Sequence, residues 1–335
     1  MPDIGSGRVI MDHKRLGNSG LKVSRLCLGC MTYGASDQGN HSWTLPEEES
    51  RPFIRQALDL GITFFDTANV YSDGSSEEII GRAFKDFVRR EDIVLATKVN
   101  GATRRTDANA TGLSRRAIMR EIDASLTRLQ TDYVDLYQIH RWDEDTPIEE
   151  TMEALHDVVR AGKATYIGAS SMSAWQFSKA QYVAKMNGWT PFVSMQNQLS
   201  LLYREEEREM LPLCADQGVG IIPWSPQGRG LLTRPWGQST GRSGTDNVIP
   251  KLYGDTAEMD RGIVDAVQTV AQRHGVAMSQ VALSWVLQNP LVTAPIIGAS
   301  KPHHLTDAVA ALALTLSPED IAELEGAYRP RAAVI

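Results

Sequence analysis

Short apolar runs and longer amphipathic segments alternate along the chain from residue 24 onward. The short runs are rich in β-branched and aromatic residues, as strands are, while the longer segments repeat their apolar positions at helical spacing. This alternation predicts repeated βα units around a parallel sheet. The predicted strands are Arg25–Leu28, Ile62–Asp66, Ile93–Lys98, Tyr133–Ile139, Ala164–Ala169, Phe192–Gln196, Val219–Trp224 and Ala294–Ile297.

The segments between these strands predict helices, several of which begin after Ser, Thr or Asp with Glu close behind. Eight strands separated by helices fit a closed barrel, so we expect an α/β protein with a (β/α)8 TIM barrel. An N-terminal β-hairpin, Lys14–Leu16 with Leu21–Ser24, is expected to plug one end, and extra helices follow at the C-terminal end. The predicted helices cover residues 48–60, 76–89, 114–129, 149–161, 173–186, 205–217, 258–274, 278–289, 302–310 and 318–328.

One long segment breaks the pattern. Residues 225–255 are rich in Gly, Pro, Ser and Arg and show no sustained period. Loops of this length usually serve as lids or are disordered, and the position after the seventh strand favours a lid over about residues 225–257. No linker-like change of composition occurs elsewhere, so residues 1–335 are predicted to form a single domain.

Composition narrows the class of protein. The chain has 335 residues, of which 42% are apolar and 22% charged, as in ordinary globular proteins. The net charge of −7 is spread along the chain, which argues against a nucleic-acid partner and for a small-molecule one. Because the sequence shows neither a membrane span nor a secretion signal, we expect a cytoplasmic protein without a membrane partner; its oligomeric state is left open.

Three cysteines occur, and two of them form Cys27-Leu28-Gly29-Cys30. Such spacing can mark a redox pair or half of a zinc site. There is no second pair, and the motif ends an apolar strand instead of opening a helix. We therefore interpret both residues as structural and predict no metal site.

Four polar residues follow the ends of predicted strands two, three and four: Asp66, Tyr71, Lys98 and His140. Singly, each has an ordinary structural explanation, such as helix capping for the carboxylate or packing for the phenol. Together they can converge on one pocket, because the active sites of such barrels lie at the carboxyl ends of the strands.

Their chemistry suits the reduction of a carbonyl group. The developing alkoxide needs a proton, and a phenol donates one readily only when a nearby ammonium stabilises its anion. Lys98 would stabilise Tyr71, Asp66 would hold Lys98, and His140 would orient the substrate oxygen.

The run from Gly61 to Tyr71, GITFFDTANVY, followed by Ser76–Gly81, SEEIIG, resembles the signature of the aldo-keto reductases. Further motifs recur in that family's order, so the resemblance covers about residues 12–330; they are Ala96-Thr97-Lys98, Gln138-Ile139-His140, Ile167–Ser171, Met195-Gln196-Asn197 and Trp224-Ser225-Pro226. Residues 27–34, 40–48, 140–143 and 203–212 are similar to the bacterial YajO-type branch of the family.

The resemblance implies NADPH as cofactor. Gln196 and Ser170 would bind its carboxamide, Ser171 stands where the family usually has Asn, and Trp224 would stack on the nicotinamide ring. By their equivalence to positions in members of that family, Ser300, Lys301 and His304 would hold the 2′-phosphate. Asp307 would reach the adenine or close the lid.

Because no Gly-x-Gly-x-x-Gly follows the first strand, the pyrophosphate must bind elsewhere. Residues 225–231 offer flexible amides and a cation, and the turn at 298–300 leads into a helix whose N-terminus favours an anion. The full predicted cofactor set is Cys30, Met31, Asp66, Ser170, Ser171, Gln196, Trp224, Ser225, Pro226, Gln227, Gly228, Arg229, Gly230, Gly298, Ser300, Lys301, His304 and Asp307.

Substrate contacts are expected from Tyr33, Trp142 and Trp236, for which packing at the barrel rim is an equal alternative. The predicted reaction is reversible reduction of an aldehyde or ketone to an alcohol. Two other functions remain open at this point: a sugar-phosphate enzyme that forms 1-deoxyxylulose 5-phosphate, for which Arg234 and Arg242 would have to bind the phosphate, and an NADPH-binding redox sensor that docks onto a partner, as the related potassium-channel β subunits do.

Overall fold

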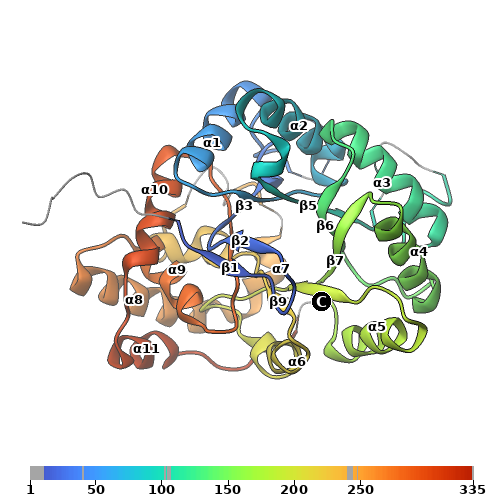
Figure 1. Ribbon diagram of the computed structural model, residues 1–335. Coiled ribbons are helices and arrows are strands. Elements are labelled where there is room, and N and C mark those ends of the chain that lie inside the picture. Colours follow the sequence, from blue (N-terminus) through green and yellow to red (C-terminus); the bar gives the residue numbers. More distant parts are fainter. Residues whose placement is uncertain are drawn as a thin grey trace, which may run out of the picture.

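The computed structural model describes residues 11–39, 41–101, 103, 107–239, 244–246 and 248–333, except the side chain of Asp255. Its main feature is an eight-stranded parallel sheet surrounded by helices (Figure 1). The strands are β3 (Cys27–Gly29), β4 (Phe64–Asp66), β5 (Val94–Val99), β6 (Val134–Ile139), β7 (Ala164–Ser170), β8 (Phe192–Gln196), β9 (Gly220–Ile221) and β10 (Ile296–Ile297).

The sheet closes on itself. Its strand order is β10-β3-β4-β5-β6-β7-β8-β9, so β9 and β10 are the two ends. A parallel bridge pairs Ile221 with Val292, and the amide of Thr293 donates to the carbonyl of Ile221 at 2.8 Å. These bonds join the ends of the sheet, and the fold is the predicted (β/α)8 barrel.

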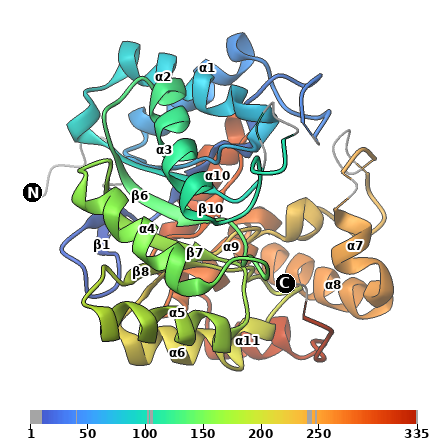
Figure 2. The same ribbon diagram turned by 90° about the vertical axis from the view of Figure 1, so that its right-hand side faces the viewer.

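The helices follow the predicted positions closely, because their apolar faces pack on the sheet. Figure 2 shows α3, α4 and α5 side by side around the barrel. The helices are α1 (Glu47–Asp59), α2 (Ser75–Phe87), α3 (Arg115–Leu129), α4 (Ile148–Arg160), α5 (Ala174–Asn187), α6 (Met210–Gln217), α7 (Ile249–Tyr253), α8 (Ala257–His274), α9 (Met278–Gln288), α10 (Pro302–Ala310) and α11 (Pro318–Glu325).

Two local differences have physical reasons. The seventh strand is predicted over 219–224, but its regular part ends at Ile221, because Pro223 has no N–H to donate. The amides of Ile222 and Trp224 on either side still donate to the carbonyls of Met195 and Asn197. The segment predicted as a lid contains elements that its composition did not indicate: η5 (Gly228–Thr233), α7 and η6 (Gly254–Thr256). Leu252 and Tyr253 of α7 are buried, so tertiary packing stabilises a helix too short to form alone.

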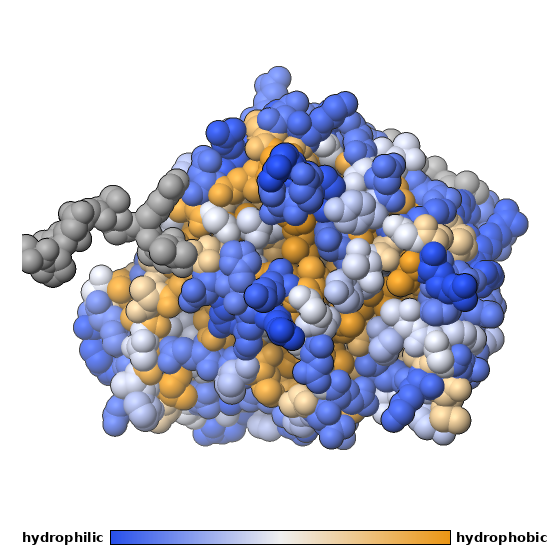
Figure 3. Space-filling model, viewed as in Figure 1, coloured by the Kyte–Doolittle hydropathy of each residue, from blue (hydrophilic) through white to orange (hydrophobic). Residues whose placement is uncertain are grey.

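The predicted hairpin is present as β1 (His13–Arg15) and β2 (Lys22–Ser24). Leu16, which follows β1, and Val23 of β2 pack against an apolar layer inside the barrel that includes Phe64, Ala96 and Leu136. The hairpin itself turns hydrophilic side chains outward, with apolar residues visible around it (Figure 3). The hairpin therefore plugs one end of the barrel, and α7 lies at the opposite end (Figure 2).

The inside of the barrel changes from apolar to polar along the strands. Inward-facing residues alternate with residues that face the helices, as parallel strands require. Near the hairpin the inward layer includes Phe64, Ala96 and Leu136. Two residues further along the same strands come Asp66, Lys98 and Gln138, all buried. The polar end is thus the carboxyl end, where such barrels carry their active sites.

The described residues contain neither a membrane-spanning helix nor a cluster of metal ligands. Within them, no helix is long and apolar enough to cross a membrane, and no group of three His, Cys, Asp or Glu is placed to hold a metal ion. Cys27 and Cys30 are buried free thiols, and burial raises the pKa of both. Protonated, buried thiols fit the structural interpretation of the CxxC spacing.

Candidate active site

Lys98 is the centre of the site. Its ammonium, fully buried at the end of β5, donates to Asp66 Oδ2 at 2.6 Å, to the carbonyl of Thr67 at 2.9 Å and to the hydroxyl of Tyr71 at 3.0 Å. An ammonium has three hydrogens, and these three bonds use all of them. The Tyr71 oxygen therefore accepts a hydrogen bond from Lys98, which leaves its own hydrogen free to be donated to another group.

The remaining member of the predicted set lies beside the phenol. The rings of Tyr71 and His140 meet edge to face with centroids 5.6 Å apart, and both are partly exposed. The geometry therefore brings all four predicted residues together, with the charged pair inside and the two rings toward the outside.

Burial sets the protonation states of these groups. Burial raises the pKa of Tyr71, and Lys98 only partly offsets it, so the phenol is protonated at neutral pH. Burial, then the charges of Lys98 and Arg141, hold the pKa of His140 well below its usual value, so the imidazole is neutral. Burial alone would lower the pKa of Lys98, but Asp66 and Tyr71 outweigh it and raise the pKa to about 12. Of the two partly exposed rings, the phenol of Tyr71 is the stronger acid, because a neutral imidazole can donate a hydrogen bond but gives up its N–H proton less readily than a phenol.

Two glutamines complete the surroundings of Asp66. Gln138 Nε2 and Gln196 Nε2 each donate to Asp66 Oδ1 at 2.9 Å. Lys98 takes the other carboxylate oxygen, so both oxygens of the buried carboxylate are satisfied. Gln138 had no predicted role, although its place two residues before His140, near the carboxyl end of β6, indicates an inward-facing side chain.

The predicted nicotinamide side lies at the ends of β7 to β9. Trp224 Nε1 donates to Ser171 Oγ at 3.0 Å, and the hydroxyls of Ser170 and Ser171 lie 3.2 Å apart. Ser171 adopts a left-handed backbone with φ of 47°. The shorter serine that replaces the family's Asn is thus the residue that holds the indole of Trp224.

The predicted pyrophosphate residues belong to a tight turn. Gly228, Arg229 and Gly230 are all left-handed, with φ of 58°, 54° and 92°. Arg229 Nε and Nη2 both donate to Asp246 Oδ2, at 2.9 and 2.7 Å, and both side chains are nearly inaccessible. The cation expected to meet the pyrophosphate is therefore paired within the protein.

The predicted 2′-phosphate residues surround the start of α10. Ser300 and Lys301 are exposed, and the amide of Ser300 donates to His304 Nδ1 at 3.3 Å. Asp307 instead accepts from Gln280 Nε2 of α9 at 3.3 Å. A Cβ added at Gly298 would lie 3.4 Å from Thr32 Oγ1, so the short helix η1 (Cys30–Thr32), with Cys30 and Met31, adjoins this turn. Pro226 is buried, and Ser225 and Gln227 lie beside it half-buried.

The three predicted substrate residues differ in their exposure to solvent. Tyr33 is fully buried and stacks on Phe53, so the structure places it in the core and not at the mouth. Trp142 is half-buried and lies 6.1 Å, ring to ring, from the exposed Trp175 of α5. Trp236 is 37% exposed. Of the three, only the two tryptophans can meet a ligand from solvent. Trp175, which no sequence motif indicated, lies beside Trp142 and is exposed as well.

Comparison with known proteins agrees with this site. The aldo/keto reductase family model matches residues 25–329. Versiconal hemiacetal acetate reductase of Aspergillus parasiticus is 47% identical over 342 residues, which cover 96% of this chain and 98% of that protein. An aldo-keto reductase of Fusarium vanettenii is 42% identical, with 97% and 93% covered. A Schizosaccharomyces pombe protein named provisionally as an aryl-alcohol dehydrogenase is 44% identical, with 94% and 95% covered.

These relatives are fungal, and the likeness to the bacterial YajO-type branch stays a prediction. The match spans nearly the whole barrel and includes β4 with Asp66, β5 with Lys98, and His140 directly after β6. The chain belongs to the aldo/keto reductase family and is an oxidoreductase that acts on carbonyl and CH–OH groups.

Proposed function

We propose that this enzyme reduces aldehydes or ketones with NADPH and that Tyr71 is its general acid. The observation that carries the proposal is the complete use of the Lys98 ammonium by Asp66, Thr67 and Tyr71. The hydrogen bond from Lys98 orients the phenol of Tyr71 so that the hydroxyl hydrogen of Tyr71 faces a substrate oxygen. When bound, the cofactor supplies the hydride.

Each of the four residues has a separate role toward the substrate oxygen that becomes an alkoxide. Tyr71 donates its proton to that oxygen, and Lys98 stabilises the phenolate that remains. Asp66 keeps Lys98 charged and in place. His140, neutral, donates a hydrogen bond to the same oxygen without competing for the proton. In alcohol oxidation the phenolate of Tyr71 accepts the proton instead.

The side chains at the mouth fit a nicotinamide dinucleotide. Trp224, held by Ser171, offers an aromatic face, and Ser170 and Gln196 offer polar groups for a carboxamide. At the other end, the exposed ammonium of Lys301 lies at the N-terminus of α10, where a phosphate is stabilised. A cation at this place supports NADPH over NADH, because only NADPH carries the additional phosphate.

The relatives' names point to bulky substrates: a hemiacetal acetate in one case and aryl alcohols in another. The Trp142–Trp175 pair offers a matching aromatic surface, since Trp175 is 61% exposed. We therefore expect aryl and other large carbonyl compounds to be better substrates than small aldehydes.

The test is NADPH oxidation over a carbonyl panel, followed by the near-ultraviolet absorbance of the cofactor, with NADH and sugar phosphates as further arms. Tyr71→Phe should lower kcat by about 10²–10⁴-fold while NADPH still binds. Tyr182→Phe, which removes an exposed hydroxyl on α5, is the matched control and should behave as wild type.

Turnover that survives in Tyr71→Phe would remove Tyr71 from the mechanism. Tight NADPH binding without consumption of any carbonyl would favour the sensor function. Cofactor-independent conversion of a sugar phosphate would favour the sugar-phosphate enzyme.

A further inference from the structure

The backbone immediately after Tyr71 is unusual. Ser72, Asp73 and Gly74 are all left-handed, with φ of 45°, 54° and 89°. Glycine adopts this conformation readily and aspartate does so occasionally, so Ser72 is the residue most strained by it. Strained backbone persists where surrounding contacts over-determine it, and it gathers at functional sites.

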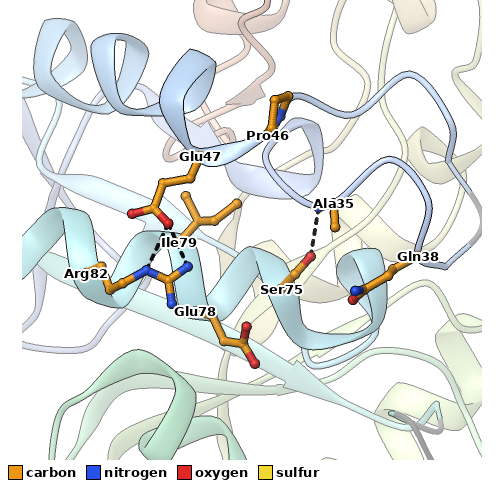
Figure 4. Close-up of a pocket in the computed structure, with 8 residues that line it drawn as sticks. All are labelled: Ala35, Gln38, Pro46, Glu47, Ser75, Glu78, Ile79 and Arg82. Atoms are coloured by element: carbon orange, nitrogen blue, oxygen red, sulfur yellow. Dashed lines mark hydrogen bonds and ion pairs between the residues drawn. The ribbon is translucent and has the colours of Figure 1, made fainter.

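One hydroxyl connects this turn to a distant loop. Ser75 Oγ donates to the carbonyl of Ser72 at 2.8 Å and accepts from the amide of Ala35 at 2.9 Å. Figure 4 shows the bond between Ser75 and Ala35 at the edge of a pocket of about 250 Å³. The loop that follows β3 is thereby attached to the first residue of α2.

The turn is also enclosed on two sides. A Cβ added at Gly34 would lie 2.3 Å from Ser72 Oγ, and one added at Gly74 would lie 2.9 Å from Arg128 Cδ. Arg128 is itself held by the buried carboxylate of Glu77, to which its Nε donates at 2.7 Å. The loop at 34–39 and Arg128 of α3 therefore both lie against the turn.

Tyr71 lies between two anchors of the backbone. Before it, the amides of Thr67 and Asn69 donate to the carbonyls of Ala96 and Lys98 on β5. After it, the turn is held by the hydroxyl of Ser75. The distance of 3.0 Å between the Tyr71 oxygen and Lys98 Nζ depends on both anchors, because the ring extends from the backbone between them.

We infer that Ser75 is a positioning residue for Tyr71: by bridging Ala35 and Ser72 it keeps the left-handed turn closed and holds the phenol against Lys98. This inference rests on the proposed function. Its role differs from that of Ser76, whose hydroxyl donates to the carbonyl of Cys30 and meets Thr67 away from the turn.

The test compares Ser75→Ala with Ser50→Ala. Ser50 of α1 is also a buried serine, and its hydroxyl donates to the backbone carbonyls of Leu45 and Pro46. These two carbonyls lie at the other end of the loop that contains Ala35. Ser75→Ala should lower kcat roughly tenfold, with KM for NADPH unchanged, because small misplacements of reacting groups are costly. Ser50→Ala should keep the wild-type kcat even if it unfolds at a lower temperature.

A pH profile separates positioning from general loosening. In alcohol oxidation the rate rises with pH as Tyr71 ionises. Weaker contact with Lys98 raises the pKa of Tyr71, so this rise should move to higher pH in Ser75→Ala and stay in place in Ser50→Ala. Ser75→Thr, which keeps the hydroxyl and has the adjoining pocket for its methyl group, should restore both values.

Equal kcat and equal pH profiles in the two alanine variants would overturn the inference. If Ser75→Ala does not fold, Ser75→Cys keeps the volume with a weaker donor and should show an intermediate loss; wild-type kcat in that variant overturns it as well. The proposed function fails separately, when the wild type shows no Tyr71-dependent turnover.

Discussion

The two halves of the candidate site are built differently. At the proposed acid–base centre, Asp66 and Lys98 are buried and every hydrogen of the Lys98 ammonium has an acceptor. On the proposed phosphate side, Arg229 is also buried in a pair with Asp246, but Lys301 is exposed. The first set comes from neighbouring strands, whereas the second comes from loops and helix ends.

The difference reflects what each half has to do. Proton transfer needs groups held to within a fraction of an ångström before the substrate arrives, which strands of a packed barrel provide. A cofactor must enter and leave, which loops permit. The comparison predicts that changes at the centre affect catalysis and folding together. Changes on the phosphate side should affect cofactor binding, and stability as well where they break the buried Arg229–Asp246 pair.

The largest effect is expected from Lys98→Met. It leaves the Asp66 carboxylate buried without its ion partner, which costs about 3–5 kcal/mol of stability. The phenol also loses the cation that stabilises its anion, so kcat should fall by about 10²–10⁴-fold. Denaturant unfolding and NADPH oxidation measure the two effects. Lys179→Met on the exposed face of α5 is the control, and similar stability of the two variants would contradict the prediction.

A smaller effect is expected on the phosphate side. Arg229→Met should raise the Kd for NADPH at least tenfold, since a hydrogen bond from the guanidinium to the pyrophosphate would contribute about 1.5–3 kcal/mol. It also leaves the Asp246 carboxylate buried without its ion partner, so the free energy of unfolding should fall too. Asp246→Asn keeps the shape but removes the charge that competes for the guanidinium, so NADPH should bind at least as tightly as in wild type.

Titration by tryptophan fluorescence measures both constants. Equal weakening in the two variants would show that the Arg229–Asp246 pair serves the fold and not the cofactor.

The smallest effect is expected from pH, on which the kcat for reduction should hardly depend near neutrality. Because the pKa of His140 is lowered, the imidazole gains a proton only below its ordinary value of about 6.5. Because the pKa of Tyr71 is raised, the phenol loses its proton only above about 10. The kcat for reduction should therefore stay constant between about pH 6.5 and 9. An inflection inside this range that disappears in His140→Asn would show that the imidazole titrates during catalysis.

The sequence by itself determined the barrel and predicted which four residues would meet at its carboxyl end, where we propose the acid–base centre. Both follow from local pattern: strand positions repeat with period two, and residues just after the carboxyl ends of parallel strands meet at one end of a barrel. Asp66, Lys98 and His140 occupy such positions, and Tyr71 follows in the next loop, so their convergence did not depend on details of packing.

Only the tertiary structure decided the partners of these residues. Gln196 reaches Asp66 across 130 positions, and Ser75 reaches Ala35 across 40, because closure of the barrel and packing of its loops bring them together. Tyr33 lies in the core because Phe53 covers it, and Arg229 faces Asp246 within an aperiodic segment. Periodicity records which side of an element a residue faces, whereas its contacts depend on what the rest of the chain places there.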